Sequence, residues 1–177
     1  LLLFLFLPVL LSAQETWFFS DGTTTSYYDQ GLVDVANLGS SYFEYTSPPG
    51  MPQYSDKVPC STNAWKGNSS LKFNYSSAPG GNWKVRIFRT GWSTTDVSTL
   101  DTLAFYAFSS TEVPASALPL IGLVTLKTGG SAEISSKLYK LSDYNNGLQP
   151  GKWTRITFPL KVIMSDAGNS TMNFAAA

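Results

Sequence analysis

The chain has no histidine and a single cysteine, Cys60, among its 177 residues. Without histidine, neither Ser-His-Asp nor Cys-His catalysis is possible, and zinc sites built on imidazole ligands are excluded as well. A single cysteine cannot form a disulfide within the chain. We expect Cys60 to serve as a small apolar side chain in the core, with a reactive thiol as the alternative.

Charged residues are also scarce, at 14% of the chain, and the 12 Lys and Arg residues balance the 12 Asp and Glu residues. Binding to phosphate groups needs a surplus of positive charge, so we expect no nucleic-acid partner. The glycine-rich motifs GxGxxG and GxxxxGK[ST], which cradle nucleotide phosphates, are absent from the sequence as well.

The chain has four glutamates, Glu15, Glu44, Glu112 and Glu133. A glycosidase needs two carboxylates about 5 to 10 Å apart on facing elements. Glu44 and Glu133 fall on expected strands, but neither has a second acid at strand spacing. We therefore expect a protein that is not itself an enzyme, with a hydrolase or lyase on the same fold as a lower-ranked alternative.

The apolar run LLLFLFLPVLLSAQ opens the chain at residues 1–14. It is shorter than the about 20 residues that span a bilayer, and its length and small-residue end are typical of a signal peptide. An apolar strand or helix is the alternative. No basic segment or initiator Met precedes the run, and the chain stops at NSTMNFAAA, where another strand could begin. We expect an N-terminally incomplete signal peptide (1–14) and one C-terminally truncated domain (15–177). The mature chain would be secreted or held at the cell surface, without a membrane span.

Aromatic residues, at 14%, and short β-rich runs dominate the rest of the sequence. Clusters of Gly, Pro, Asn and Ser separate the runs, and no sustained helical periodicity follows residue 15. The predicted strands are Thr16–Ser20, Ser41–Thr46, Ser70–Tyr75, Asn82–Arg89, Thr102–Ser109, Leu120–Lys127, Ala132–Leu138 and Lys152–Leu160. In the last of these, KWTRITFPL, one face carries Ile156, Phe158 and Leu160, and the opposite face carries Trp153, Arg155 and Thr157. A sheet with one face in contact with solvent is typical of an antiparallel sandwich. The sequence predicts an all-β protein, an antiparallel β-sandwich of the jelly-roll type that lacks its last strand or strands.

The stretch GGNWKVRIFRTGW, residues 80–92, combines aromatic and basic side chains. Alternation places Trp83 on the core face and Arg86 and Phe88 on the opposite face. Trp92 follows in a turn, where no strand alternation predicts that its side chain is buried. This stretch is therefore predicted to be a core strand whose other face is available to a ligand.

The strand DTLAFYAFS, residues 101–109, is apolar on both faces and carries Tyr106 and Phe108 on one of them. Such a strand is either covered on both sides, or its second face lines an aromatic groove. Sugar sites combine a few rigid aromatic rings with convergent polar groups. The residues expected to bind the ligand are Arg86, Phe88, Trp92 and Tyr106. Packing alone is the alternative for each aromatic ring, and Trp65, in NAWKGNSS, has the same two interpretations.

The loop SDGTTTSYYDQG, residues 20–31, sets Asp21 and Asp29 among many backbone carbonyls. Carboxylate and carbonyl oxygens in a flexible loop are ligands that Ca²⁺ accepts. The spacing does not match an EF-hand loop, and Asp-Gly is first of all a turn signal. A structural calcium ion at Asp21 is one interpretation, and a plain turn is the other.

Three Asn-x-Ser/Thr sequons begin at Asn68, Asn74 and Asn169. They accept N-linked glycans only in hosts that carry out this modification.

Five segments stand in a fixed order between Trp17 and Leu160: FSDG, GNSSLKFNYSS, GGNWKVRIFR, DVSTLDTLAFYAFSS and LSDY…GLQPGKWTRITFPL. This order resembles non-catalytic carbohydrate-binding modules of secreted bacterial proteins, which have a galactose-binding-like jelly-roll fold. The resemblance implies a domain attached to a glycoside hydrolase or to a cell-surface protein. It also implies one structural calcium, held by an acid near the first strand, which Asp21 matches, and by an Asp in a last strand that has no counterpart in this sequence.

Together these observations predict a secreted module that binds a polysaccharide or oligosaccharide through aromatic and Arg side chains without cleaving it. The rival prediction is a structural or adhesion domain of a cell-surface protein with no glycan ligand. The two differ in whether the outward aromatic rings gather on one face or scatter singly.

Overall fold

The computed structural model describes residues 15–19, 26–52 and 54–177. Its strands are β1 (Tyr27–Tyr28), β2 (Gly31–Leu38), β3 (Tyr42–Phe43), β4 (Val58–Ser61), β5 (Ser70–Leu71), β6 (Tyr75–Ser76), β7 (Asn82–Ile87), β8 (Thr102–Ser109), β9 (Val113–Pro114), β10 (Leu120–Ile121), β11 (Val124–Lys127), β12 (Glu133–Ser135), β13 (Tyr139–Lys140), β14 (Gly147–Leu148), β15 (Lys152–Pro159) and β16 (Met172–Asn173). Its helical segments are η1 (Thr90–Trp92), η2 (Ala115–Ala117), η3 (Leu141–Asp143), α1 (Leu160–Met164) and η4 (Ala167–Asn169). Within these described ranges, none of the helical segments could reach across a bilayer.

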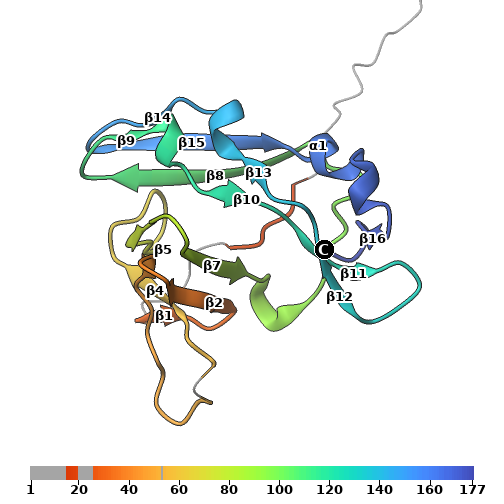
Figure 1. Cartoon of the computed structure of the whole chain (residues 1–177), viewed down its shortest axis with the longest axis horizontal. Helices are drawn as coiled ribbons and strands as arrows, with labels where there is room; N and C mark the ends of the chain where they lie inside the picture. The colour runs from red at the N-terminus through yellow and green to blue at the C-terminus, as the bar shows by residue number, and fades with distance from the viewer. Residues whose placement is uncertain (1–14, 20–25, 53) are drawn as a thin grey trace, which may run out of the picture.

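The strands form two layers, as Figure 1 shows. In one layer, β8 and β15 pair along their whole length, from Thr102↔Pro159 to Ser109↔Lys152, with β9 and β14 beside them. In the other layer, β2 pairs with β7, and β1, β4 and β5 form a three-stranded sheet next to them. All strand pairs in the described part of the chain are antiparallel. The prediction of an all-β antiparallel sandwich is confirmed.

The larger apolar cluster covers one face of β15, where Ile156 is 1% exposed and Phe158 is fully buried. These two residues alternate with Arg155 and Thr157, which lie on the other face because a strand has a period of two. The buried members are Val97, Leu123, Leu141, Leu148, Ile156, Phe158, Leu160, Ile163 and Met172. The predicted core face of this strand is confirmed.

The second layer has a smaller apolar cluster. Its buried members are Val33, Phe43 and Val58. Trp83 packs against it, with ring centroids 5.2 Å from Phe43 and 4.6 Å from Tyr75, and its Nε1 donates to Ser77 Oγ at 3.1 Å. Trp83 is therefore a packing residue, as its position in the alternation predicted.

Three of the predicted strands match the structure well. β8 occupies the predicted range Thr102–Ser109, and β7 and β15 lie within the ranges predicted for them. The strand predicted over Lys152–Leu160 ends one residue early, at Pro159, because α1 begins at Leu160.

Other predicted strands are wrong or too long. Thr16–Phe19 form no strand, and Ser20 lies outside the described residues. The strand predicted over Ser70–Tyr75 divides into β5 and β6, and Phe73 between them is 41% exposed. The ranges around β3, β10, β11 and β12 are likewise shorter than predicted.

β2 and β4 were not predicted. The pairing of β2 with β7 shifts register twice, between Val33 and Val35 and between Val35 and Leu38. Such bulges break the period of two that marks a strand in a sequence. β4 contains Pro59, and proline within a short run argues against a strand.

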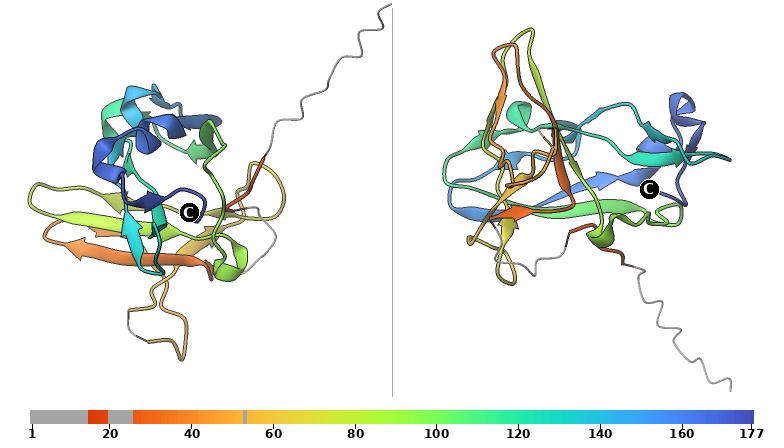
Figure 2. Two further views of the ribbon diagram at one scale, coloured as in Figure 1. Left: turned by 90° about the vertical axis from the view of Figure 1, so that its right-hand side faces the viewer. Right: turned by 90° about the horizontal axis from the view of Figure 1, so that it is seen from below.

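A hairpin projects from the body of the domain where residues 46–52 and 54–57 lie (Figures 1 and 2). The Thr46 amide donates to Lys57 O at 3.0 Å, and the Lys57 amide donates to Thr46 O at 2.8 Å. Tyr54, beyond this pairing, is 80% exposed. The hairpin thus adds an arm to the domain without adding to either apolar cluster.

Cys60 lies half-buried in β4, opposite Leu71 of β5. Burial raises the pKa of its thiol, which keeps the group protonated and lowers its reactivity at neutral pH. The side chain is only half-buried and belongs to neither apolar cluster, so the expected place in the core is not found.

A polar network fastens η4 to the segment before β13. Asn169 is a buried residue, with 3% of its surface exposed. Its side-chain Nδ2 donates to Tyr139 Oη and to Ile163 O, both at 2.8 Å. Its Oδ1 accepts from the Lys137 amide at 3.2 Å. Because this amide nitrogen is buried and already bonded, the Asn169 sequon offers no accessible acceptor for a glycan in the folded state.

Asp166 is the second centre of this network. Its Oδ1 accepts from Lys137 Nζ at 2.8 Å and from the Gly168 amide at 2.8 Å, and its Oδ2 accepts from Tyr139 Oη at 2.9 Å. The hydrogen bond from the Lys137 ammonium, followed by those from Gly168 and Tyr139, lowers the pKa of the Asp166 carboxyl from 3.8 to about 2.

We expect part of the acid sensitivity of the fold to come from Asp166. The pKa of its carboxyl group is lower in the folded state than in the unfolded chain. The ionised group therefore stabilises the fold above about pH 4, and this stabilisation is lost as the pH falls toward about 2. The Asp166→Asn variant should be less stable at neutral pH and should lose less stability over this acid range. Urea unfolding followed by tryptophan fluorescence at several pH values measures both effects.

The control for this prediction is Asp101→Asn. Asp101 forms an ion pair with Lys161 at 3.4 Å in which both side chains are exposed, at 80% and 79%. Exposed pairs contribute little to stability, so this variant should follow the parent chain. An Asp166→Asn variant that also follows the parent would contradict the assigned role.

Candidate functional site

One face of the β8–β15 pair, opposite the one that carries Ile156 and Phe158, is rich in aromatic side chains. Trp153 lies opposite Phe108 in the register, and Arg155 lies opposite Tyr106. Directly opposed residues share a face, and this face is the one turned away from the buried Ile156. Tyr106 is 42% exposed and Phe108 is 36% exposed, so the rings of β8 are open to solvent.

A ring from the other layer lies on top of this face. Trp65 belongs to the connection between β4 and β5, and its ring stacks on that of Tyr106 with centroids 4.4 Å apart and planes at 11°. The Trp65 ring is 6.4 Å from Trp153, and Trp153 is 5.5 Å from Phe108. We call these four residues, Trp65, Tyr106, Phe108 and Trp153, the aromatic platform.

The Trp65 ring presents a flat surface to solvent. One of its faces is covered by Tyr106, yet the residue is 53% exposed, so this exposure belongs to the opposite face and the ring edges. The stack on Tyr106 also holds the indole in one orientation. A rigid, half-exposed aromatic ring supplies apolar contact area at a small cost in conformational entropy. Such a surface can receive the apolar C–H face of a flat ligand.

The predicted ligand-binding residues do not all lie together. Tyr106 is part of the aromatic platform. Phe88 and Trp92 form a separate ring pair with centroids 4.8 Å apart, next to β7. Trp92 is 44% exposed, and its φ of 59° is unusual for a residue other than glycine. The sequence thus identified aromatic residues that the structure divides between two places.

Arg86 is held between two carboxylates. Its Nε lies 2.7 Å from Asp34 Oδ2, its Nη2 donates to Asp34 Oδ1 at 2.9 Å, and its Nη1 donates to Glu133 Oε2 at 3.0 Å. Its Cζ also lies 5.4 Å from the centre of the Phe88 ring. These contacts connect β7 to β2 and to β12, and they leave the guanidinium little capacity for a ligand.

We expect Arg86→Gln to lower the free energy of unfolding by about 1–3 kcal/mol, because Asp34 and Glu133 would each lose a charge-assisted hydrogen bond. Ligand binding by the aromatic platform should remain unchanged. Urea unfolding and a binding titration on the same preparation test both statements. If the variant is as stable as the parent but no longer binds the ligand, Arg86 is a ligand-binding residue, as the sequence predicted.

The carboxylates considered for catalysis are both paired. Glu44 accepts from Lys72 Nζ at 2.8 Å and from Asn74 Nδ2 at 3.1 Å, and the pKa of its carboxyl is lowered by these two bonds. Glu133 pairs with Arg86, as described above. A hydrolase or lyase would need one of them in a cleft with an Arg or a second acid, and neither lines the hollow described next.

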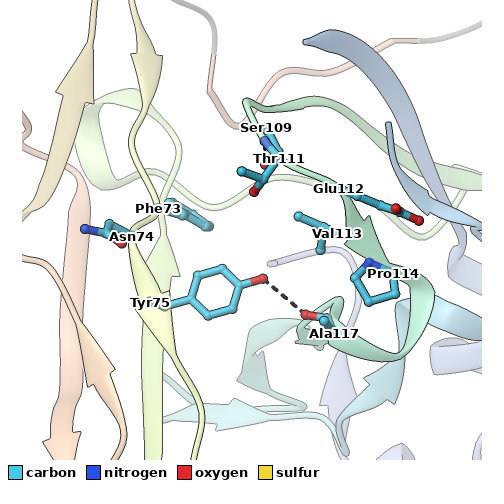
Figure 3. A pocket seen from close by; sticks show the side chains of 9 residues that line it. All are labelled: Phe73, Asn74, Tyr75, Ser109, Thr111, Glu112, Val113, Pro114 and Ala117. Atoms are coloured by element: carbon cyan, nitrogen blue, oxygen red, sulfur yellow. Dashed lines mark hydrogen bonds between the residues drawn. The ribbon is translucent and has the colours of Figure 1, made fainter. Parts of the chain in front are cut away.

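A hollow of about 330 Å³ lies between β6 and the segment after β8 (Figure 3). The residues that line it are Phe73, Asn74, Tyr75, Ser109, Thr111, Glu112, Val113, Pro114 and Ala117. Tyr75 reaches across it and donates its hydroxyl to Ala117 O at 3.2 Å, whereas the Glu112 side chain extends away from Tyr75 (Figure 3). The hydrogen bond from Tyr75 joins the two layers here, so we interpret the hollow as a structural feature. We place the candidate site on the aromatic platform.

The predicted calcium ligand Asp21 lies outside the described residues. Among the residues that are described, no three Cys, Asp or Glu side chains are placed to hold a metal ion together. Asp29, from the same loop, has its carboxylate 3.6 Å from Lys57 Nζ, and its carbonyl accepts from that ammonium at 2.8 Å. Asp29 therefore takes part in the local packing of Lys57.

Sequence reasoning considered Trp65 without assigning it and placed Trp153 and Arg155 on a polar outer face. The alternation in KWTRITFPL contained the signal for Trp153, since it set this residue opposite the core. No sequence signal connects Trp65 to Tyr106, because their contact joins distant parts of the chain through the fold.

Comparisons with known proteins give a likeness in fold. No family model matches the chain, and no significant match exists among curated proteins. Among solved structures, the chain is similar to a β-1,2-glucanase from Parabacteroides distasonis, with a TM-score of 0.60 and 20% sequence identity. The match covers 90% of this chain and 21% of the glucanase chain, so this chain spans about a fifth of the length of its structural neighbour. At this identity, the likeness establishes a shared fold.

Proposed function

We propose that this chain is a carbohydrate-binding domain that holds a polysaccharide on the aromatic platform without cleaving it. The observation that carries the proposal is the Trp65 ring, which lies flat on Tyr106 with its other face exposed. Sugar rings have apolar C–H faces that stack on such surfaces, and a preformed surface needs little rearrangement to bind them. Phe108 and Trp153 extend the contact area along β8 and β15.

Two further facts support this function. Four aromatic rings lie in contact with one another on and beside the β8–β15 pair, and such a group favours a binding face over aromatic residues that each lie alone on the surface. The structural neighbour is named as a β-1,2-glucanase, and a binding domain is a plausible part of a longer carbohydrate-active chain. The proposal places the domain outside the cell, where polysaccharides are found.

Affinity electrophoresis on a panel of polysaccharides tests the proposal. The chain is run through native gels that contain β-1,2-glucan, other neutral plant and microbial glycans, or acidic glycans. We expect retardation by at least one class and no release of reducing ends during incubation. A folded chain that no glycan retards would overturn the proposal and favour the structural or adhesion domain. Release of reducing ends would favour the hydrolase alternative.

A further inference from the structure

Arg155 extends the aromatic platform with a positive charge. It lies opposite Tyr106 in the register of β8 and β15, and it shares its face with Trp153 two residues away. The residue is exposed, and within the described ranges its side chain makes no hydrogen bond, ion pair or ring contact. Among the described residues, the guanidinium thus has no partner, and it lies on the face whose rings are proposed to hold a sugar.

The other two arginines differ from Arg155. Arg86 is held by Asp34 and Glu133, and Arg89 donates to Thr95 Oγ1 at 3.5 Å. Several lysines are also paired with carboxylates, namely Lys57, Lys72, Lys84, Lys137 and Lys161. The chain has equal numbers of acidic and basic residues, yet Arg155 forms no ion pair with any carboxylate among the described residues.

The face around Arg155 has no negative charge of its own. Its positions are Thr102, Ala104, Tyr106 and Phe108 on β8, and Trp153, Arg155, Thr157 and Pro159 on β15. None of these is Asp or Glu. Lys66, next to Trp65 in the sequence, is a second exposed cation. The net charge of these strand positions is therefore positive, although the whole chain is neutral.

We infer that the platform selects an anionic polysaccharide, in which the sugar that stacks on the rings carries a carboxylate or a sulfate ester that Arg155 binds. This inference rests on the proposed function of the platform. The planar guanidinium can donate two parallel hydrogen bonds to either anion, and this arrangement is stronger and more specific than a contact with a neutral hydroxyl.

The test compares acidic glycans with neutral ones in affinity gels. The polymers are polygalacturonate for the carboxylate, a sulfated galactan for the sulfate ester, and galactan and β-1,2-glucan as neutral references. The proteins are the parent chain, Arg155→Gln, Arg155→Lys and, as a control with the same change in charge, Arg89→Gln. We expect one acidic polymer to retard the parent most strongly. Arg155→Gln should weaken that retention about tenfold, because a charge-assisted hydrogen bond is lost.

Two controls separate recognition from general charge. Arg155→Lys should fall between the parent and Arg155→Gln, because it keeps the charge but loses the bidentate geometry. Arg89→Gln should behave as the parent does. Salt at about 1 M should weaken the retention of the parent more than that of Arg155→Gln, since screening acts on exposed charges.

The outcomes distinguish carbohydrate binding in general from a preference for an anionic polysaccharide. Retention by polygalacturonate alone, by the sulfated polymer alone or by both supports the inference and identifies the anion. Retention by neutral polymers that Arg155→Gln does not weaken overturns the inference and leaves the proposed function standing. No retention by any polymer overturns the proposed function, and the inference with it.

Discussion

Replacing Trp65 by alanine should lower the affinity for the retained polysaccharide about 30-fold or more, while the domain stays folded. Trp65 supplies the outermost ring of the aromatic platform, and its exposed face is the flat surface proposed to contact the sugar. The substitution removes this surface and leaves the apolar clusters untouched. Isothermal titration with an oligosaccharide of the retained glycan measures the effect.

Trp92→Ala is the matched control for this prediction. Trp92 is also a half-exposed tryptophan, at 44%, but it belongs to the ring pair with Phe88 and not to the platform. Its removal should leave the affinity unchanged. If Trp92→Ala abolishes binding and Trp65→Ala does not, the site lies beside β7, at the predicted ligand-binding residues Phe88 and Trp92.

Replacing Phe158 by alanine should lower the free energy of unfolding by about 3–5 kcal/mol. Phe158 is fully buried in the larger cluster, with its ring 5.8 Å from Tyr139 and 5.2 Å from Tyr144. The truncation would leave a cavity in the cluster that holds β15 in place. Because a domain of this size has about 5–15 kcal/mol of stability, the variant should be marginally folded. Urea unfolding by circular dichroism measures the loss.

Phe108→Ala separates the core from the binding surface. Phe108 lies on the paired strand but on the opposite face, and it is 36% exposed. Its removal should cost about 1 kcal/mol or less in stability and should weaken glycan binding. An equal loss of stability in both variants would mean that the outer face is packed as a core, and this would contradict its assignment as a binding surface.

The strands with a regular period were predictable. β15 alternates without interruption, and β8 is an unbroken apolar run, so the extent of both strands and the core face of β15 followed from the sequence. β2 was missed because its bulges break the alternation, and β4 was missed because it contains Pro59. Local patterns identify a strand only where the pairing is regular.

The candidate site could be predicted only in part, because its residues are brought together by contacts between segments that are distant in sequence. Arg86 and Arg155 occupy similar positions in alternating strands, and the sequence alone gives no reason to prefer one. The fold places Asp34 and Glu133 against Arg86 and leaves Arg155 without a carboxylate among the described residues. Tyr106 was identified from its strand, whereas its stack with Trp65 depends on the path of the connection between β4 and β5.

The most direct measurement is hydroxyl-radical footprinting of the chain with and without the retained oligosaccharide, read by mass spectrometry. It reports on each aromatic side chain separately and needs no variant. If the aromatic platform is the binding site, the ligand should protect Trp65, Tyr106 and Trp153 from oxidation, while Trp92 and Tyr54 react as before. Protection of Phe88 and Trp92 with unchanged oxidation of Trp65 would contradict the account.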